Sequence, residues 1–185
     1  MSGSIARQLT LLGDPAITET AKRLWPDALP ASSREKNDRI LLISNTLKSG
    51  SGNALAGKKI FNNRCGACHR LFGEGADIGP ELTGYDRKNI NEILINIIDP
   101  SAFIREGYVT YHVKTKDKRS IVGTMKSQHG STIVIQPFNG EDITLDRNQV
   151  EEMTEQSESL MPEGLLNGLS DQDVRDLIAY ISQDR

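Results

Sequence analysis

The sequence has few cysteines and histidines, no long apolar run and no excess of basic residues. Its 185 residues include two cysteines and three histidines. No apolar run is long enough to cross a bilayer as a helix. The 25 acidic residues outnumber the 22 basic ones, and the resulting net charge of −3 gives no surface for a polyanion. We therefore expect neither a transmembrane segment in this chain nor a nucleic-acid partner.

The two cysteines that are present stand together in Cys65-Gly66-Ala67-Cys68-His69. Two cysteines separated by two residues, with a histidine directly after the second, have the spacing of a c-type haem attachment site. Both thiols would add to vinyl groups of the porphyrin, and the adjacent imidazole would lie on the axis of the iron as its proximal ligand. The motif therefore predicts one covalently bound haem c, with His69 as an iron ligand.

Two other chemistries use the same pair of cysteines: a structural zinc site and a thioredoxin-like dithiol. Zinc would need two more soft ligands, but His112 and His129 lie far along the chain and not at the spacing of a zinc knuckle. A thioredoxin motif follows a strand and opens a helix, whereas the residues before Cys65 have the pattern of a helix. Haem is the preferred interpretation, and the dithiol and the metal site stay open as alternatives.

A proximal imidazole is held in one tautomer by a hydrogen bond to its outer nitrogen. The loop Ile78-Gly79-Pro80-Glu81-Leu82-Thr83-Gly84 follows the motif, and the carbonyl of Pro80 is a candidate acceptor for His69. An ordinary Gly-Pro turn is the other interpretation of this stretch.

Met161 is the candidate for the second axial ligand. It precedes a proline in a loop before the last predicted helix, where a thioether is well placed to reach the distal side of the iron. Met125 and Met153 fall in predicted strands and are interpreted as packing residues. His112 and His129 are the rivals of Met161, the first on a predicted strand and the second in a predicted hairpin turn.

Hydrophobic periodicity predicts helices at both ends of the chain and strands between them. Helices are expected as two short segments within 5–25, at about 34–48, from Asn53 into the cysteine motif, from Ile90 to Asp99, and after Ser170; strands are expected at about 109–113, 119–126, 131–137, 143–145 and 150–153. Asp14, Asn53 and Ser170 are the expected N-caps, Pro26 and Pro30 are expected to break the chain, and Asn139-Gly140 is a two-residue hairpin signal.

These motifs resemble those of class I cytochrome c. The resemblance covers about residues 50–185 and rests on Gly57, Phe61, Cys65 to His69, the loop 78–84, Met161-Pro162, Leu177 and Tyr180. It implies that the first and last helices of the domain cross, with Gly57 and Phe61 against Leu177 and Tyr180. In more detail the chain is similar to a haem-binding domain family found at the C-termini of large exported planctomycete and verrucomicrobial proteins.

The expected fold class is mainly α, a cytochrome c-like helical haem domain with an inserted small β-barrel-like module and an N-terminal helical segment. Residues 1–50 would form the helical segment, either as the end of a helical repeat region or as an N-terminal helical cap. Residues 51–106 and 157–185 would form the haem domain, and residues 107–156 the inserted module.

The function that the resemblance implies is electron transfer through a haem bound by His69 and Met161, without enzymatic activity in this chain. The redox partner would be a fused or separate dehydrogenase. Covalent haem attachment normally takes place outside the cytoplasm, so we expect a periplasmic or otherwise exported protein. Because the first residues lack a secretory signal pattern, we expect a fragment whose export signal lies elsewhere in its parent, with Met1 to Ser4 an added leader.

Two alternatives belong to other classes of function. A haem enzyme or ligand sensor would need an open or labile distal iron site. In the other alternative, the β module would dock a partner and the haem would serve as its redox tether.

Overall fold

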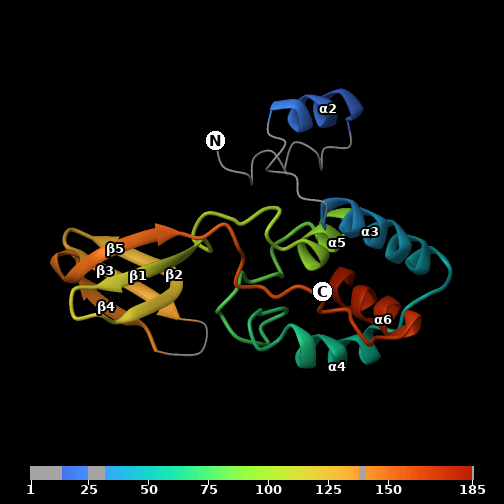
Figure 1. The fold of residues 1–185 in the computed structure, drawn as a ribbon. Coiled ribbons are helices and arrows are strands. Elements are labelled where there is room, and N and C mark those ends of the chain that lie inside the picture. The colour runs from blue at the N-terminus through green and yellow to red at the C-terminus, as the bar shows by residue number, and fades with distance from the viewer. Residues whose placement is uncertain (1–13, 25–31, 138–140, 185) are drawn as a thin grey trace. The chain divides into compact units, whose positions relative to one another are not determined.

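The computed structural model describes residues 14–24, 32–137 and 141–184 (Figure 1). The chain divides into two compact units, one formed by Met1–Phe103 with Pro162–Arg185 and the other by Ile104–Met161. The described residues form five α-helices, five β-strands and one 3₁₀ turn. The expectation of a mainly α fold is therefore wrong, because the second unit consists of a five-stranded sheet.

The first unit is built from helices that begin where the sequence supplies a cap. The described helices are α2 (Pro15–Leu24), α3 (Ser32–Lys48), α4 (Ala54–Arg64), α5 (Ile90–Ile98) and α6 (Asp171–Ser182). Asp14, Asn53 and Ser170 accept hydrogen bonds from the first free backbone amides of α2, α4 and α6. These three N-cap predictions are confirmed. Among the described residues, no helix is long and apolar enough to cross a membrane.

Helices α4 and α6 cross in direct backbone contact at Gly57. A β-carbon at this position would lie 1.9 Å from the carbonyl oxygen of Asp176 and 2.9 Å from Cβ of Tyr180. One turn further along α4, the ring of Phe61 lies 5.5 Å from that of Tyr180 at an interplanar angle of 58°. Both aromatic side chains are buried. The predicted contact of Gly57 and Phe61 with Tyr180 is confirmed.

The same crossing buries a carboxylate. Asp176 is 6% exposed, and its Oδ1 accepts hydrogen bonds from the backbone N–H of Asn53 and from Nε2 of Gln172, both at 2.7 Å. A buried carboxylate needs such donors because it has lost its water. Asp176 therefore ties the start of α4 to α6.

Helix α3 packs against α5 and α6 within the same unit. Ile40 and Ile43 of α3 are buried, as are Leu94, Ile97 and Ile98 of α5. The apolar stripe predicted for α5 thus faces the core. The short helix expected before residue 14 and the breaks expected at Pro26 and Pro30 lie outside the described residues.

The second unit is an antiparallel sheet in the order β4-β3-β2-β1-β5. Its strands are β1 (Thr110–Thr115), β2 (Ser120–His129), β3 (Thr132–Pro137), β4 (Ile143–Asp146) and β5 (Val150–Glu155). The register of β2 shifts between Met125 and Ser127. The first half of β2 pairs with β1 and the second half extends along β3, so the strand bends at this bulge.

The edge strands β4 and β5 are joined by a single 3₁₀ turn, Arg147–Gln149. In a flat sheet the two edges would lie about 19 Å apart, at about 4.8 Å per strand. A connection this short reaches at most about 14 Å, so the sheet must be strongly curled. No pairing joins β4 to β5 among the described residues of the unit, and the expected barrel is therefore not closed.

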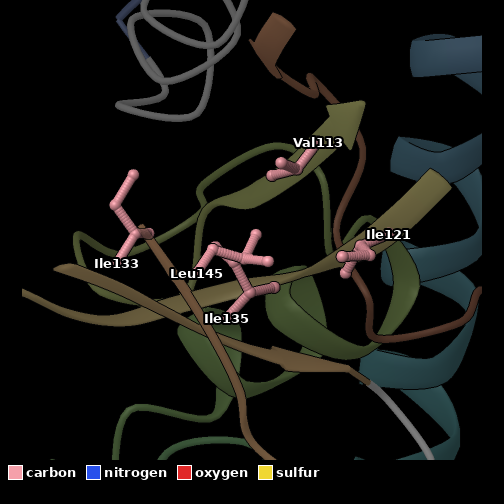
Figure 2. Packing of buried hydrophobic residues seen from close by; sticks show 5 residues of the cluster. All are labelled: Val113, Ile121, Ile133, Ile135 and Leu145. Carbon is pink, nitrogen blue, oxygen red and sulfur yellow. The ribbon is translucent and has the colours of Figure 1, made fainter. Parts of the chain in front are cut away.

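Alternating apolar side chains of the sheet meet on one side. Figure 2 shows the buried cluster formed by Val113, Ile121, Ile133, Ile135 and Leu145, which come from β1, β2, β3 and β4. This alternation is the period that the sequence predicts for a sheet with one buried face. Met125 and Met153 pack against the cluster, which confirms their predicted packing role. The turn expected at Asn139-Gly140 lies outside the described residues.

Candidate functional site

The cysteine motif forms a tight turn at the end of α4. The N–H of Cys65 donates to the carbonyl of Phe61 at 2.7 Å, and the N–H of His69 donates to the carbonyl of Cys65 at 2.9 Å. The helix thus continues into one further turn that carries Cys68 and His69. The motif follows a helix, which is the arrangement expected for haem attachment and not for a thioredoxin-like dithiol.

The loop 76–82 runs alongside this turn. Three backbone hydrogen bonds join the two segments: Ala76 N–H to Gly66 O at 3.1 Å, Gly79 N–H to Cys68 O at 2.7 Å, and Leu82 N–H to Arg70 O at 2.8 Å. These bonds satisfy three amides of a loop that has no regular secondary structure of its own. The pairing holds the loop against the residues on both sides of His69.

The structure brings His69 and Pro80 together. Nδ1 of His69 lies 2.9 Å from the carbonyl oxygen of Pro80. A carbonyl can only accept a hydrogen bond, so Nδ1 carries the proton and Nε2 keeps its lone pair. An imidazole fixed in this tautomer is the form that binds a metal through Nε2.

Gly79 forms a cradle for the imidazole. A β-carbon at position 79 would lie 2.6 Å from Cε1 and 2.9 Å from Nδ1 of His69. Only a residue without a side chain leaves the ring in its place. The tautomer and the cradle together fit His69 as the proximal ligand of a haem iron.

Cys65 and Cys68 are free thiols, and each is half-buried. Burial, together with the neighbouring Cys68, raises the pKa of Cys65 to about 12. Burial also raises the pKa of Cys68. The low thiol pKa that a reactive dithiol needs is therefore missing.

A zinc site finds no support in the described part of the chain. It contains no group of three or more His, Cys, Asp or Glu side chains that could hold a metal ion. His112 belongs to the β unit, where its Nε2 lies 2.7 Å from Oγ of Ser120. His129 is exposed at the end of β2.

Comparison with known proteins agrees with this geometry. Residues 54–184 match the family of cytochrome c. The chain belongs to the cytochrome c family. Members of this family carry haem c bound covalently to a pair of cysteines spaced like Cys65 and Cys68, and they are generally electron carriers. No curated protein matches the chain. The matched range begins with α4, includes the β unit and leaves α2 and α3 outside it.

Arg87 binds the C-terminal end of helix α6 in this cytochrome c domain. Its Nη1 donates to the carbonyls of Ile181 at 3.0 Å and Gln183 at 2.6 Å, and its Nε donates to the carbonyl of Thr83 at 3.2 Å. The guanidinium also lies 4.7 Å from the centroid of the Phe72 ring. A cation at a helix C-terminus satisfies free carbonyls and complements the helix dipole. Arg87 therefore ties the end of α6 to the loop that carries Pro80.

The loop that carries Pro80 is stiffened by a small network. Oγ1 of Thr83 bonds to the carboxylate of Glu81, which also accepts the Thr83 N–H at 3.0 Å. The N–H of Phe72 in turn donates to Oγ1 of Thr83 at 2.8 Å. The hydrogen bond from the Thr83 side chain lowers the pKa of Glu81 below its usual value of 4.5.

Replacing Glu81 with glutamine should make the cytochrome slightly less stable at neutral pH only. Because the pKa of Glu81 is lowered by folding, its stabilisation is present above the unfolded pKa and lost as the pH falls through the folded pKa. The exposed carboxylate limits the difference to less than about 1 kcal/mol. Urea unfolding of Glu81→Gln and the exposed control Glu158→Gln, from neutral to acid pH, checks this. An equal effect in both variants, or one that grows in acid, would contradict it.

Met161 is assigned to the β unit as its last residue, and Pro162 resumes the helical unit. The side chain is half-buried, and the Met161 N–H donates to Oγ of Ser159 at 3.1 Å. The structure thus brings Cys65, Cys68, His69 and Pro80 together in one unit. The pairing of Met161 with His69 stays a prediction.

Sequence reasoning did not predict the roles that Gly79 and Arg87 play in shaping the site. The steric role of Gly79 was signalled by its place directly before the acceptor Pro80, where the chain passes the imidazole. Arg87 carries no comparable signal, because its partners Ile181 and Gln183 lie almost a hundred positions away along the chain.

Proposed function

We propose that this chain is a single-haem electron-transfer module whose iron is held between Nε2 of His69 and the thioether of Met161. The observation that carries the proposal is the imidazole of His69, which is fixed by Pro80 in the tautomer that leaves Nε2 available. Cys65 and Cys68, one turn before and directly beside it, would hold the porphyrin. The haem would supply reversible one-electron chemistry.

The protein's contribution would be to hold the side chains of His69 and Met161 in place in both oxidation states. The hydrogen bond from Nδ1 to Pro80 and the contact with Gly79 fix the direction of the His69 imidazole. A thioether supplied by Met161 would favour the reduced iron and raise its potential. With His69 and Met161 both holding the iron, little would need to move when an electron is gained or lost.

Met161 is supported by its place in the chain and by the roles of the other methionines. Met125 and Met153 are engaged with the apolar cluster of the sheet. Met161 instead lies in the segment between the sheet and α6, next to Pro162. This order of cysteine motif, Gly-Pro loop, Met-Pro loop and final helix is the one that the resemblance to class I cytochrome c implies.

The partners proposed for this module are a dehydrogenase, fused or separate, and a downstream acceptor. The proposal includes a place outside the cytoplasm and membership of the planctomycete and verrucomicrobial haem-binding family. It is supported by the resemblance of the segments around Asp99-Pro100 and Ser159 to Leu165. Sequencing the complete parent reading frame, followed by reduction of the purified module by its dehydrogenase, tests this part.

Replacing Met161 with alanine should open the distal side of the iron. The ferric wild-type protein is expected to show the weak sulfur-to-iron absorption band at the red end of the spectrum, and its ferrous form should not bind carbon monoxide. Met161→Ala should lose the band and bind carbon monoxide readily, whereas Met153→Leu should behave like the wild type. A wild-type protein that already binds carbon monoxide would favour a haem enzyme or ligand sensor instead.

A further inference from the structure

A partly buried ion pair with a third, exposed member joins three segments of the helical unit. Nζ of Lys36, on α3, lies 2.7 Å from Oδ1 of Asp99 and 2.6 Å from Oε1 of Glu163. Asp99 is the C-cap of α5 and is 8% exposed. Glu163 belongs to the loop between the sheet and α6. One ammonium group therefore holds the end of α5 and this loop at the same point.

A second contact from α3 reaches the same loop. Nη2 of Arg39 donates to Oδ1 of Asn167 at 2.7 Å. Lys36 and Arg39 are three residues apart and thus lie on one side of the helix. Side chains of α3 therefore contact both ends of the loop 163–167. Helix α3 itself lies outside the range 54–184 that matches the cytochrome c family.

These contacts lie very close to Met161 along the chain. Only Pro162 separates Met161 from Glu163, and the proline ring fixes its own φ near −65°. Few backbone torsions are then free between the anchored Glu163 and the proposed iron ligand. Holding Glu163 consequently restricts where the backbone of Met161 can go.

We propose that Lys36 is a positioning residue for the distal methionine, and that α3 acts through Glu163 to set how readily Met161 leaves the iron. This inference rests on the proposed function, because it takes Met161 as the distal ligand. It assigns to the N-terminal helix a role in the electron-transfer site that a mere helical cap would not have.

The two ion pairs of Lys36 differ in their exposure to water, as the proposed positioning role requires. The Asp99 side chain is 11% exposed and that of Lys36 17%, so the Lys36–Asp99 ion pair is largely removed from water and helps to hold the helical unit together. The Glu163 side chain is 54% exposed, so the Lys36–Glu163 ion pair is screened by water. Removing the Glu163 carboxylate should therefore release the loop without unfolding the helical unit.

The first test compares Glu163→Ala with Glu158→Ala in the full haem-loaded chain. Glu158 is the matched control because it is an exposed glutamate three residues before Met161. Imidazole added to the ferric protein competes for the distal site, and loss of the sulfur-to-iron band reports its binding. We expect Glu163→Ala to bind imidazole about two- to fivefold more tightly than the wild type, the range of a partly screened ion pair. Its urea midpoint should stay that of Glu158→Ala.

The second test separates positioning from charge. Lys36→Met should raise imidazole affinity at least as much as Glu163→Ala, and it should also lower the urea midpoint because Asp99 is left buried without its cation. Lys36→Arg should restore the wild-type imidazole affinity. Adding Glu163→Ala to Lys36→Met should change the imidazole affinity no further, since both substitutions remove the same restraint.

The outcomes distinguish failure of this inference from failure of the proposed function. A wild-type protein without the sulfur-to-iron band would show that Met161 is not the ligand, and both would fall. A wild-type protein with the band, but with imidazole affinities of Glu163→Ala and Glu158→Ala that agree, would overturn the role of Lys36 alone. Additive effects in the double variant would overturn it as well.

Discussion

Replacing Gly57 with alanine should lower the free energy of unfolding by about 3 kcal/mol, at the upper end of what overpacking usually costs. The added β-carbon would lie 1.9 Å from the carbonyl oxygen of Asp176, which is backbone and cannot rotate away. Helices α4 and α6 would have to move apart. Alanine is the better helix former by about 1 kcal/mol, but this gain is too small to offset the clash.

Separation of the two helices should also loosen the contacts further along the crossing. The rings of Phe61 and Tyr180 would lose part of their contact, and Asp176 would be pulled from the N–H of Asn53. A buried carboxylate that loses a donor costs more than the bond itself contributed. We therefore expect the variant to unfold at lower urea concentration and to give less haem-loaded protein.

Gly84→Ala is the matched control for this substitution. A β-carbon at Gly84 meets no atom within 4 Å, so its addition should change stability little. Urea unfolding of both haem-loaded variants, followed by far-ultraviolet circular dichroism, checks the prediction. Equal midpoints for Gly57→Ala and Gly84→Ala would show that the close crossing does not support the fold.

Replacing Gly79 with alanine should disturb His69, the proposed iron ligand. The new β-carbon would lie 2.6 Å from Cε1 of His69, while the Gly79 N–H is tied to the carbonyl of Cys68 at 2.7 Å. Because the backbone is held, the imidazole must turn, and its hydrogen bond to Pro80 should lengthen or break. We expect the free energy of unfolding to fall by about 1–3 kcal/mol.

The reduction potential should change together with the stability. A hydrogen bond from Nδ1 to a carbonyl makes the imidazole a stronger electron donor to the iron. Loss of this bond weakens the donor and stabilises ferric iron less, so the potential of Gly79→Ala should rise. Redox titration of the haem absorption, with Gly84→Ala from the same loop as control, measures the shift. A potential equal to that of the control would mean that the His69 imidazole keeps its hydrogen bond.

The features that the sequence predicts well are those set by neighbours in the chain. Asn53 and Ser170 cap their helices because a short polar side chain meets amides two or three residues ahead. The turn that joins Cys65 to His69 depends only on five successive residues. The alternation of Ile133 and Ile135 likewise fixes which face of β3 is buried.

The features that escaped prediction depend on partners far along the chain. Lys36 binds Asp99 and Glu163, and neither pairing has a local pattern that would reveal it. Closure of the sheet was wrongly expected because it depends on whether its first and last edges meet, which strand periodicity does not determine. The fold class was also wrong: all five strands were expected, but together they form too large a part of the described residues for a mainly α fold.

The pairing of β1 with β5 makes the β unit easy to accommodate within another fold. Tyr111 stands opposite Glu155, so the chain enters and leaves the sheet on adjacent antiparallel strands, about 5 Å apart. The two ends of the β unit are therefore as close to each other as the two ends of a tight β-hairpin. Insertion of the β unit adds little loop-closure entropy to the surrounding polypeptide, so the sheet can vary in its own length or sequence without changing the distance between the two points where the chain enters and leaves it.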